Sequence, residues 1–330
     1  MNDNAKSPDP TTASHFEAPL ISLETWFHDA SYGPLLDLSG TLYAQERLVV
    51  HIPLSELRAR SFELPPREAP FVLYVTKRED LQELNRSFVG KKETTRKRPR
   101  RVVPWNITGV ILDSNETRQQ AKTLGILRSE HKNNDSIRKF VVQGRLWQPD
   151  GLVQHTLLPL LLETARPATT ARRKIWDLGA GAGRDAVYLA EELKAHGQHV
   201  RVVALDQRYR GDLTNEPCTL FMQRRGLSAD EAVCEPMDLH IVPKFMKRLE
   251  SQCLLVECLL LVRFWQQDLL KAIASSPYLE PGLLVAISHF GLATAGSEWT
   301  FPHPKVSRGI LICHSLDMIV SLFIYFVHRN

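Results

Sequence analysis

The sequence predicts an α/β protein of two domains, and three observations lead to this prediction. The chain has 330 residues, which is long enough for two separate hydrophobic cores. Short apolar runs typical of buried strands alternate with helical stretches along most of its length. One of these apolar runs leads directly into a glycine-rich turn and a further helical stretch, an arrangement that places backbone N–H groups near a bound ligand.

The first α/β domain is expected over residues 15–127, after a polar N-terminal stretch, 1–14, that we expect to be disordered. A polar linker over 128–144 follows it. Within the domain the patterns predict strands at Leu35–Leu38, Phe71–Val75 and Val110–Leu112, and helices at Arg78–Phe88 and Thr117–Leu124, the second ended by Gly125.

The second domain is expected over residues 145–306. It begins with a helical stretch, Leu152–Glu163, that Pro159 is expected to kink or split. Strands and helices then alternate. The patterns predict strands at Lys174–Leu178, Val200–Leu205, Ala232–Glu235, Leu254–Val262 and Leu283–Ser288, and helices at Asp185–Ala195 and Asp268–Ala274.

The composition excludes several classes of protein. A hydrophobic fraction of 43% and a charged fraction of 24% exclude collagen-like, wholly disordered and disulfide-scaffold chains. Five cysteines without a CxxC pair indicate a reducing compartment and no cysteine-type zinc site, and no other metal site is expected. The first residues contain no apolar segment of a secretory signal, so a cytoplasmic location is expected.

One segment carries much of the positive charge. Residues 91–101 hold seven basic residues and one Glu, a contribution of +6 to a chain whose net charge is +4, so the remainder sums to −2. We interpret this run as a solvated loop of the first domain. The alternatives are a nuclear-import signal, which would make the location nuclear, or an RNA-contacting patch.

The most informative segment is Trp176–Asp185, with the sequence WDLGAGAGRD. A dinucleotide-binding turn requires G-x-G-x-x-G, but the sixth position counted from Gly179 is Arg184. The pattern is instead an acid followed by three alternating glycines: Asp177, Gly179, Gly181 and Gly183. Small residues in such a turn let the backbone approach a ligand closely.

Two further acids end neighbouring elements. Asp206 ends the second predicted strand of this domain, where a carboxylate can accept hydrogen bonds from both hydroxyls of a ribose. Asp238 follows the third strand. An acid at the ends of three successive strands is a more specific signal than one glycine-rich turn, although each Asp alone could be a buried or capping residue.

These residues resemble motif I and the following acids of class I S-adenosylmethionine-dependent methyltransferases. The segments Leu146–Pro149, DLGAGAGRDAVYLAEEL, Leu261–Phe264 and Leu279–Gly282 are similar to a tellurite-resistance-like group of these enzymes. The resemblance implies a Rossmann-like fold, S-adenosyl-L-methionine as cofactor, and a set of cofactor-binding residues: Asp177, Gly179, Gly181, Gly183, Arg184, Asp206, Asp238 and Leu239.

The first domain resembles rhodanese, on Leu36–Leu38, on the turn His51–Pro53 and on the strand Phe71–Val75. A sulfurtransferase needs a nucleophilic Cys in the turn after the central strand. Thr76 and Lys77 stand there, and no cysteine precedes Cys218. The domain is therefore expected to be inactive as a sulfurtransferase and to serve as a binding or packing module.

The C-terminal segment 307–330 departs from the resemblance and ends in an apolar run, Met318–Val327. It can supply the last strands of the sheet in an unusual form, or act as a tail anchor, although the run is short for a membrane span. We favour a third interpretation, non-homologous sequence from an altered reading frame or a retained intron, because the change is abrupt. On that interpretation the sheet edge is incomplete and prone to aggregation.

The sequence therefore predicts an S-adenosylmethionine-dependent methyltransferase that acts by in-line transfer on an unidentified, small-molecule acceptor. Arg263, after the fourth strand, is the candidate residue on the acceptor side, and its alternative role is a salt bridge to Asp177 or Asp185. No Asn/Asp-Pro-Pro-Tyr/Phe motif occurs, which argues against the amide and exocyclic-amine methylases that use it. The alternative functions are a non-catalytic scaffold and an RNA methyltransferase that uses residues 91–101.

Overall fold

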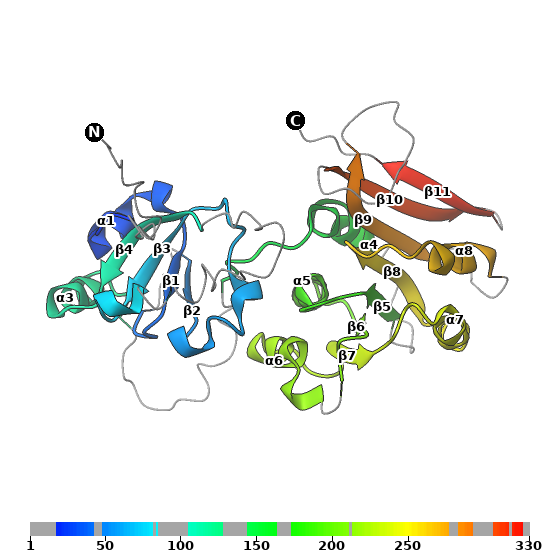
Figure 1. Cartoon of the computed structure of the whole chain (residues 1–330), viewed down its shortest axis with the longest axis horizontal. Helices are drawn as coiled ribbons and strands as arrows, with labels where there is room; N and C mark the ends of the chain where they lie inside the picture. The colour runs from blue at the N-terminus through cyan, green and yellow to red at the C-terminus, as the bar shows by residue number, and fades with distance from the viewer. Residues whose placement is uncertain are drawn as a thin grey trace, which may run out of the picture. The chain divides into compact units, whose positions relative to one another are not determined.

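The structure is a computed structural model that describes residues 18–42, 48–81, 84, 105–127, 144–163, 173–210, 213–276, 283–292, 306–316 and 319–325. Beyond residue 288 it describes the backbone alone. The chain divides into two compact units, residues 1–147 and residues 148–330 (Figure 1). The N-terminal stretch 1–14, the basic run 91–101 and nearly all of the linker 128–144 lie outside the described residues.

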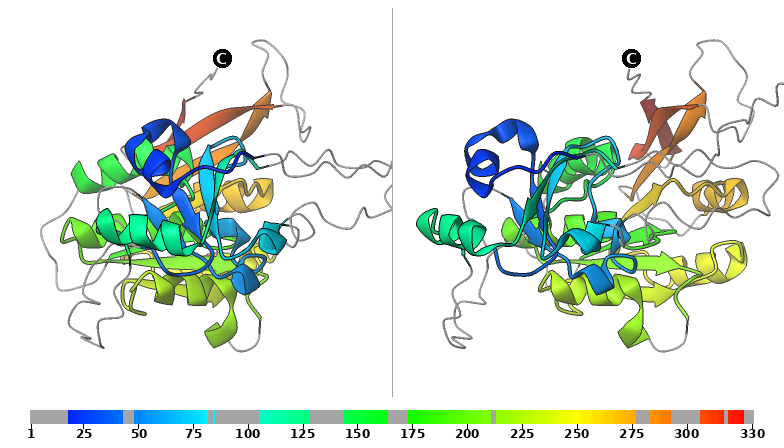
Figure 2. Two further views of the ribbon diagram at one scale, coloured as in Figure 1. Left: turned by 90° about the vertical axis from the view of Figure 1, so that its left-hand side faces the viewer. Right: turned by 60° about the vertical axis from the view of Figure 1, so that its left-hand side comes forward.

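Unit 1 is built on a parallel sheet of four strands in the order β2-β1-β3-β4. The strands are β1 (Leu35–Asp37), β2 (Val49–His51), β3 (Phe71–Val75) and β4 (Ile107–Leu112). The helices are α1 (Leu23–His28) and α3 (Asn115–Thr123), which lie side by side in Figures 1 and 2, with 3₁₀ turns at Ala30–Tyr32, Leu54–Glu56 and Ser61–Glu63. The predicted strands are confirmed; of the helix predicted at 78–88 the structure describes helical residues 78–81 and 84.

The two faces of this sheet pack against separate groups of apolar side chains. Leu35, Val72 and Tyr74 pack with Trp26 of α1 on one face. Their neighbours along the same strands, such as Leu36 and Leu73, belong to the core on the other face. Successive residues of a strand point to opposite faces, so a strand buried on both faces reads as an unbroken apolar run.

Unit 2 contains a seven-stranded sheet in the order β11-β10-β9-β8-β5-β6-β7. The five strands that come first along the chain of unit 2 are parallel to one another. They are β5 (Arg173–Leu178), β6 (Val200–Asp206), β7 (Ala232–Pro236), β8 (Val256–Val262) and β9 (Leu284–Leu292). The helices between them are α5 (Arg184–Ala195), α6 (Pro217–Arg224), α7 (Val242–Glu250) and α8 (Gln267–Ser275), with a 3₁₀ turn at Leu213–Asn215. This is the α/β, Rossmann-like architecture that the sequence predicts.

The order of these strands reverses at β5. The chain runs outward from β5 to β6 and β7, then returns to place β8 and β9 on the other side of β5. On one face of the sheet, Trp176 of β5 packs edge-on against Phe245 of α7, with ring centroids 5.9 Å apart. In open α/β sheets the crevice outside the carboxyl ends of the strands, at such a reversal, is where ligands bind.

The helix predicted at Leu152–Glu163 is continuous but irregular. A π-helical turn, η4 (Val153–Leu157), precedes α4 (Leu158–Glu163). Pro159 lies in the first turn of α4 and cannot donate the backbone hydrogen bond of a regular helix. The expected disturbance is therefore present as a wide turn just before the proline.

The C-terminal segment forms an antiparallel hairpin. Strand β10 (Val306–Leu316) pairs antiparallel with β9, and β11 (Ile319–Tyr325) pairs with β10 at the edge of the sheet. Of the three interpretations of the segment, this backbone agrees with the first, in which it supplies the last strands. The incomplete sheet edge expected from the favoured interpretation is wrong for this structure, because β9 is paired from Val285 to Leu292.

Candidate functional site

A pocket of about 250 Å³ lies at the carboxyl ends of the unit 2 strands, where the strand order reverses. Each of the four strands β5 to β8 contributes residues from its carboxyl end or from the loop that follows. The lining residues are Gly179 after β5, Asp206, Gln207 and Arg208 from β6, Met237, Leu239 and His240 after β7, and Arg263 and Phe264 after β8.

The glycine-rich turn after β5 has the backbone that its sequence requires. Gly179, Gly181 and Gly183 have φ values of +74°, +63° and +78°, in the left-handed region that favours glycine. The turn is held against β6, since the N–H of Gly179 donates to the carbonyl of Leu205 at 2.8 Å. It ends at Gly183, the N-cap of α5, so the first N–H groups of that helix lie directly beyond the glycines.

Asp206, the last residue of β6, joins the turn to the next loop. Its Oδ2 accepts the Gly181 N–H at 2.9 Å, and its Oδ1 accepts the Arg208 N–H at 2.8 Å. The Arg208 guanidinium also donates to both oxygens, from Nε at 3.1 Å and from Nη2 at 3.0 Å. Burial alone would raise the pKa of Asp206, but these hydrogen bonds outweigh it and lower the pKa.

Asp177 lies beneath the turn and does not line the pocket. It is buried at the end of β5 and interacts with the backbone of Ala186 in α5. Burial and the nearby carboxyl group of Asp185 raise the pKa of Asp177 well above its usual range. Its position is that of a support between β5 and α5.

Asp185 forms a second, partly buried carboxyl site in the first turn of α5. Its Oδ1 accepts the Asp150 N–H at 2.7 Å, which ties the helix that begins at 151 to α5. Burial raises the pKa of Asp185 to about 6. Arg184 and Arg263 both lie close enough to interact with this carboxyl group electrostatically, which agrees in part with the salt bridge considered for Arg263.

The loop after β7 contributes an apolar wall. Leu239 is 3% exposed and lines the pocket, whereas the Asp238 carboxylate accepts the His240 N–H at 3.0 Å and is not among the lining groups. His240 meets the Phe264 ring edge-on, with ring centroids 6.2 Å apart. Met237 and Leu239 therefore form the apolar wall, and His240 with Phe264 forms an aromatic one.

The loop after β8 begins with a strained residue. Arg263 has φ +56°, and among the described residues it alone has a positive φ without being glycine. Its N–H donates to the Ser288 carbonyl of β9 at 2.7 Å, which holds the backbone in place. Phe264 follows and packs on the turn, where a Cβ added to Gly179 would lie 2.8 Å from the ring. Such strain concentrates at functional sites.

Four of the residues predicted from sequence thus meet at one pocket: Gly179, Asp206, Leu239 and Arg263. Gly181, Gly183 and Asp238 lie in the same loops, Asp177 lies near the end of β5 and Arg184 begins α5, and all five are outside the pocket lining. Sequence reasoning missed Gln207, Arg208, Met237, His240 and Phe264. Four of them are immediate neighbours of predicted positions and Arg208 lies two residues after Asp206, so proximity along the loops was the available signal.

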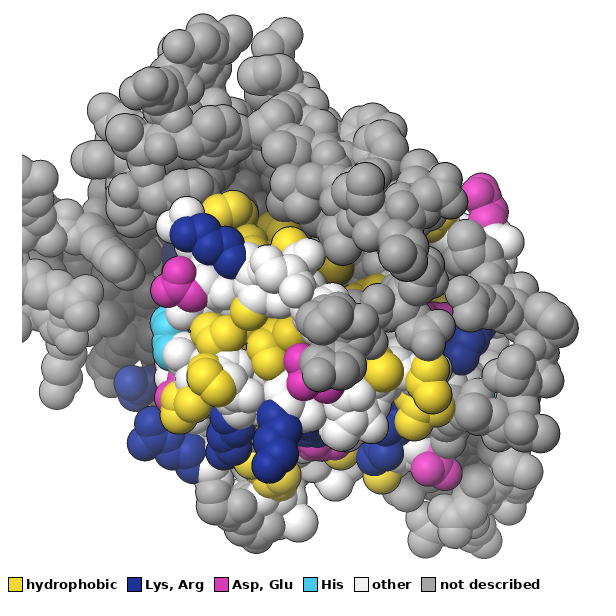
Figure 3. All heavy atoms as spheres, turned by 90° about the vertical axis from the view of Figure 1, so that its right-hand side faces the viewer, with side chains coloured by type: hydrophobic (Ala, Val, Ile, Leu, Met, Phe, Trp, Pro, Cys, Tyr) yellow, Lys and Arg dark blue, Asp and Glu magenta, His cyan; other side chains and the backbone are white. Residues whose placement is uncertain are grey.

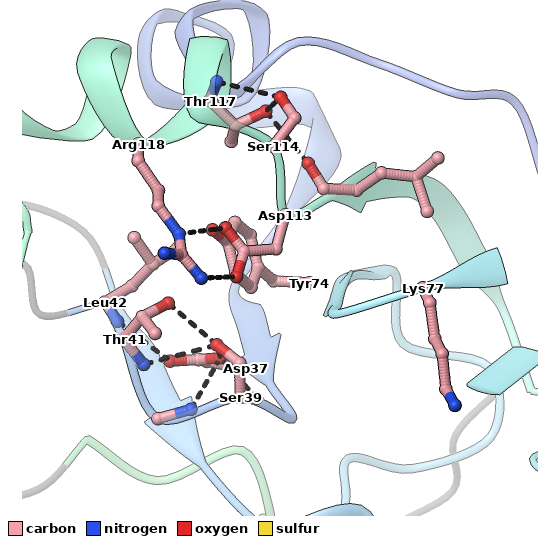
Figure 4. A network of polar contacts seen from close by, with 12 residues as sticks. Asp37, Ser39, Thr41, Leu42, Tyr74, Lys77, Asp113, Ser114, Thr117 and Arg118 are labelled. Carbon is pink, nitrogen blue, oxygen red and sulfur yellow. Dashed lines mark hydrogen bonds and ion pairs between the residues drawn. The ribbon is translucent and has the colours of Figure 1, made fainter.

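Unit 1 has its own polar network at the carboxyl end of its sheet, shown in Figure 4. Asp37, fully buried at the end of β1, accepts the N–H of Ser39, of Gly40 and of Leu42. Nearby, the Tyr74 hydroxyl donates to Asp113 at 2.8 Å, and Arg118 donates two hydrogen bonds to the same carboxylate. These carboxylates hold the loops of unit 1 to one another, which is a structural role.

The loop after β3 in unit 1 lacks a cysteine nucleophile. Thr76 and Lys77 follow the strand, and Lys77 points away from the network in Figure 4. The Lys77 N–H donates to the Asp80 carboxylate at 3.1 Å, which starts the helical residues that follow. With no sulfur in this loop, unit 1 cannot form a persulfide there.

On the face of unit 2 that carries α7 and α8, apolar side chains gather near the centre, most of the basic side chains lie below them, and acidic side chains are scattered over the face (Figure 3). Among the described residues no group of three or more His, Cys, Asp or Glu is placed to hold a metal ion. No helix in the described part of the chain has the length and apolar character to cross a membrane.

No protein-family model matches the chain, and no curated protein sequence matches it. It is similar to solved structures of methyltransferases. One is the DszA carbon methyltransferase, at 15% identity and a TM-score of 0.32 over 41% of this chain and 33% of that one, so the chain spans about a third of its length. Another is a putative protein-L-isoaspartate O-methyltransferase from Plasmodium falciparum in complex with S-adenosyl-L-homocysteine, at 13% identity and a TM-score of 0.31 over 52% of this chain and 68% of that one. A third is CalS11, a TDP-rhamnose 3'-O-methyltransferase, at 16% identity and a TM-score of 0.29 over 54% and 79%.

Proposed function

We propose that the chain is an S-adenosylmethionine-dependent methyltransferase that acts on a small-molecule acceptor. One observation carries the proposal: a glycine turn with three left-handed residues and the carboxylate of Asp206 meet at one pocket, at the reversal of strand order. The turn offers backbone N–H groups and close approach, and the carboxylate offers acceptors for a ribose.

The types of residue at the pocket suit the three portions of an adenosyl cofactor: its amino acid, its ribose and its adenine. Gly179 and the turn would hold the amino-acid portion, and Asp206 would accept hydrogen bonds from the ribose hydroxyls. Met237 and Leu239 supply the apolar wall against which an adenine ring packs. Asp177 would act indirectly, by holding the turn against α5 from below.

When bound, the cofactor supplies an electrophilic methyl group on a sulfonium. The chain's own contribution is to position the acceptor, align it and exclude water. Arg263 and Phe264 lie at the pocket on the β8 side, where the guanidinium can pair with an anionic group of the acceptor and the aromatic ring can pack against its apolar part. A dedicated base is needed only for an acceptor that must lose a proton during transfer.

Two finer assignments belong to the same proposal. The similarity of the segments DLGAGAGRDAVYLAEEL and Leu261–Phe264 supports membership of the tellurite-resistance-like group. The turn His51–Pro53 and the strand Phe71–Val75 support a rhodanese-like origin for unit 1. Without a cysteine after β3, such a unit would bind or pack and would not transfer sulfur.

Equilibrium dialysis of the full chain against labelled S-adenosylmethionine tests the proposal. We expect binding that excess S-adenosylhomocysteine displaces and excess NADH does not. Asp206→Asn should weaken binding at least tenfold, because the charged hydrogen bonds to the ribose are lost. Asp268→Asn is the matched control, since Asp268 is an exposed Asp in the first turn of α8.

Two results would contradict the proposal. Displacement by NADH would favour a dinucleotide site. The absence of binding by folded protein, checked by circular dichroism, would favour a non-catalytic scaffold. An RNA acceptor that uses the 91–101 run would instead give RNA binding that weakens steeply with salt.

A further inference from the structure

The Arg208 side chain lies at the two places where the sequence predicts contacts with a ligand, the glycine turn and the Asp206 carboxylate. Its Nη2 lies so close to the glycine turn that a Cβ added to Gly181 would be 2.7 Å from it. The same guanidinium is paired with the Asp206 carboxylate through two hydrogen bonds. Arg208 therefore lies over the open backbone of the turn and on the carboxylate at once.

The Asp206 carboxylate has no acceptor capacity left for a ribose. An ionised carboxylate offers about four lone-pair sites, two on each oxygen. Oδ1 receives the N–H and the Nε of Arg208, and Oδ2 receives the N–H of Gly181 and the Nη2 of Arg208. The two backbone donors are fixed by the fold of the turn and of the loop. A pair of ribose hydroxyls can therefore bind only at the sites that the guanidinium fills.

The cost of moving the guanidinium away is small. The Arg208 side chain is 68% exposed, whereas the Asp206 side chain is 7% exposed. Ion pairs with an exposed partner contribute little net stability, because water replaces the lost contact. The arginine can turn outward into solvent while the carboxylate keeps its two backbone hydrogen bonds.

We propose that Arg208 is a gate on the cofactor site, and that its guanidinium must leave Asp206 before the ribose of an adenosyl ligand can bind there. This inference rests on the proposed function and adds a competitor for the ligand within the chain itself. The observed affinity is the intrinsic affinity multiplied by the fraction of molecules in which the gate is open.

The test is a calorimetric titration of the full chain with S-adenosylhomocysteine. Arg208→Ala should lower the dissociation constant about two- to fivefold, the range that corresponds to a partly exposed ion pair. Arg210→Ala is the matched control: Arg210 is an exposed arginine of the same loop that does not line the pocket, and it should leave the constant unchanged.

Two further readouts test the pair: the salt dependence of binding does not follow from a merely structural role for Arg208, and the pKa of Asp206 reports whether the pair is present in solution. Raising the salt concentration should tighten binding by the unmodified chain, because salt screens the exposed pair, and this gain should be absent in Arg208→Ala. In protein without added ligand, carboxylate NMR should show a higher pKa for Asp206 in Arg208→Ala, since hydrogen bonds from Arg208 lower it.

The outcomes separate the gate from the proposed function. Binding by the unmodified chain that weakens in Arg208→Ala would mean that the arginine contacts the ligand, and it would overturn the gate. Binding that is unchanged in Arg208→Ala would overturn it as well. If neither the unmodified chain nor any variant binds S-adenosylhomocysteine, the proposed function itself fails.

Discussion

The glycines of the turn differ from other left-handed glycines of unit 2 in what surrounds them. A Cβ on Gly179 would lie 2.8 Å from Cγ and 2.9 Å from Cβ of Phe264. Gly197, after α5, has a similar φ of +68° but nothing within 4 Å of such a Cβ. A substitution at Gly197 therefore measures only the free energy lost to the left-handed backbone, whereas one at Gly179 measures that loss together with the clash against Phe264.

Substitution by alanine should distinguish these costs. Gly197→Ala should lower the free energy of unfolding by about 1 kcal/mol, the penalty of a left-handed residue. Gly179→Ala should lower it by about 1–3 kcal/mol more, because the Phe264 Cβ belongs to the start of its side chain and cannot rotate away. Urea unfolding followed by circular dichroism measures both, and equal losses would contradict the contact in the structure.

Arg263 offers a second comparison at the residue scale. Replacing it by Gly or by Ala removes the same side-chain interactions, but only Gly tolerates φ +56° without strain. We expect Arg263→Gly to be more stable than Arg263→Ala by about 1 kcal/mol, measured as the difference in urea unfolding. An alanine variant as stable as the glycine variant would show that this backbone conformation is wrong.

At the scale of the element, the start of α5 is sensitive to pH. The Asp185 side chain is partly buried, and the loss of water around its carboxyl group raises the pKa to about 6, above the ordinary value near 4. The folded state therefore binds a proton more tightly than the unfolded state does. Stability from this group is present below the unfolded pKa and is lost as the pH rises through about 6.

The corresponding prediction compares Asp185→Asn with the unmodified chain. Between pH 7 and pH 4 the free energy of unfolding of unit 2 should gain about 2 kcal/mol from protonation of Asp185. Asp185→Asn should lack that gain, while the exposed control Asp268→Asn keeps it. Urea unfolding at a series of pH values measures it, and the same pH dependence in all three proteins would contradict the burial of Asp185.

Strands of the sheet interiors were predictable because they are buried on both faces. Phe71–Val75 is strand β3 as predicted, and the strands β5 to β8 begin and end within two residues of their predicted limits, whereas β9 continues four residues beyond its predicted end. Strands were one of three interpretations of the C-terminal segment, and not the favoured one. Its apolar run was weighed by length against a membrane span, whereas its Ile, Val, Phe and Tyr content also favours strands.

At the scale of the whole molecule, the sequence predicted the place of the site better than its lining. Glycines and acids at strand ends predict a ligand edge, and the strand order of unit 2 brings those ends together. Side-chain directions within loops depend on local backbone geometry that the sequence pattern does not specify. Arg208 shows this: it turns back onto Asp206, two residues earlier in the chain.

The most direct test of the account is hydrogen–deuterium exchange of the full chain with and without S-adenosylhomocysteine. The account predicts slower exchange on ligand addition in the loops that follow β5, β6, β7 and β8, which cover residues 179–183, 206–209, 237–240 and 263–264. Exchange that is unchanged in all four loops, or that slows only in other segments, would contradict the assignment of the adenosyl site.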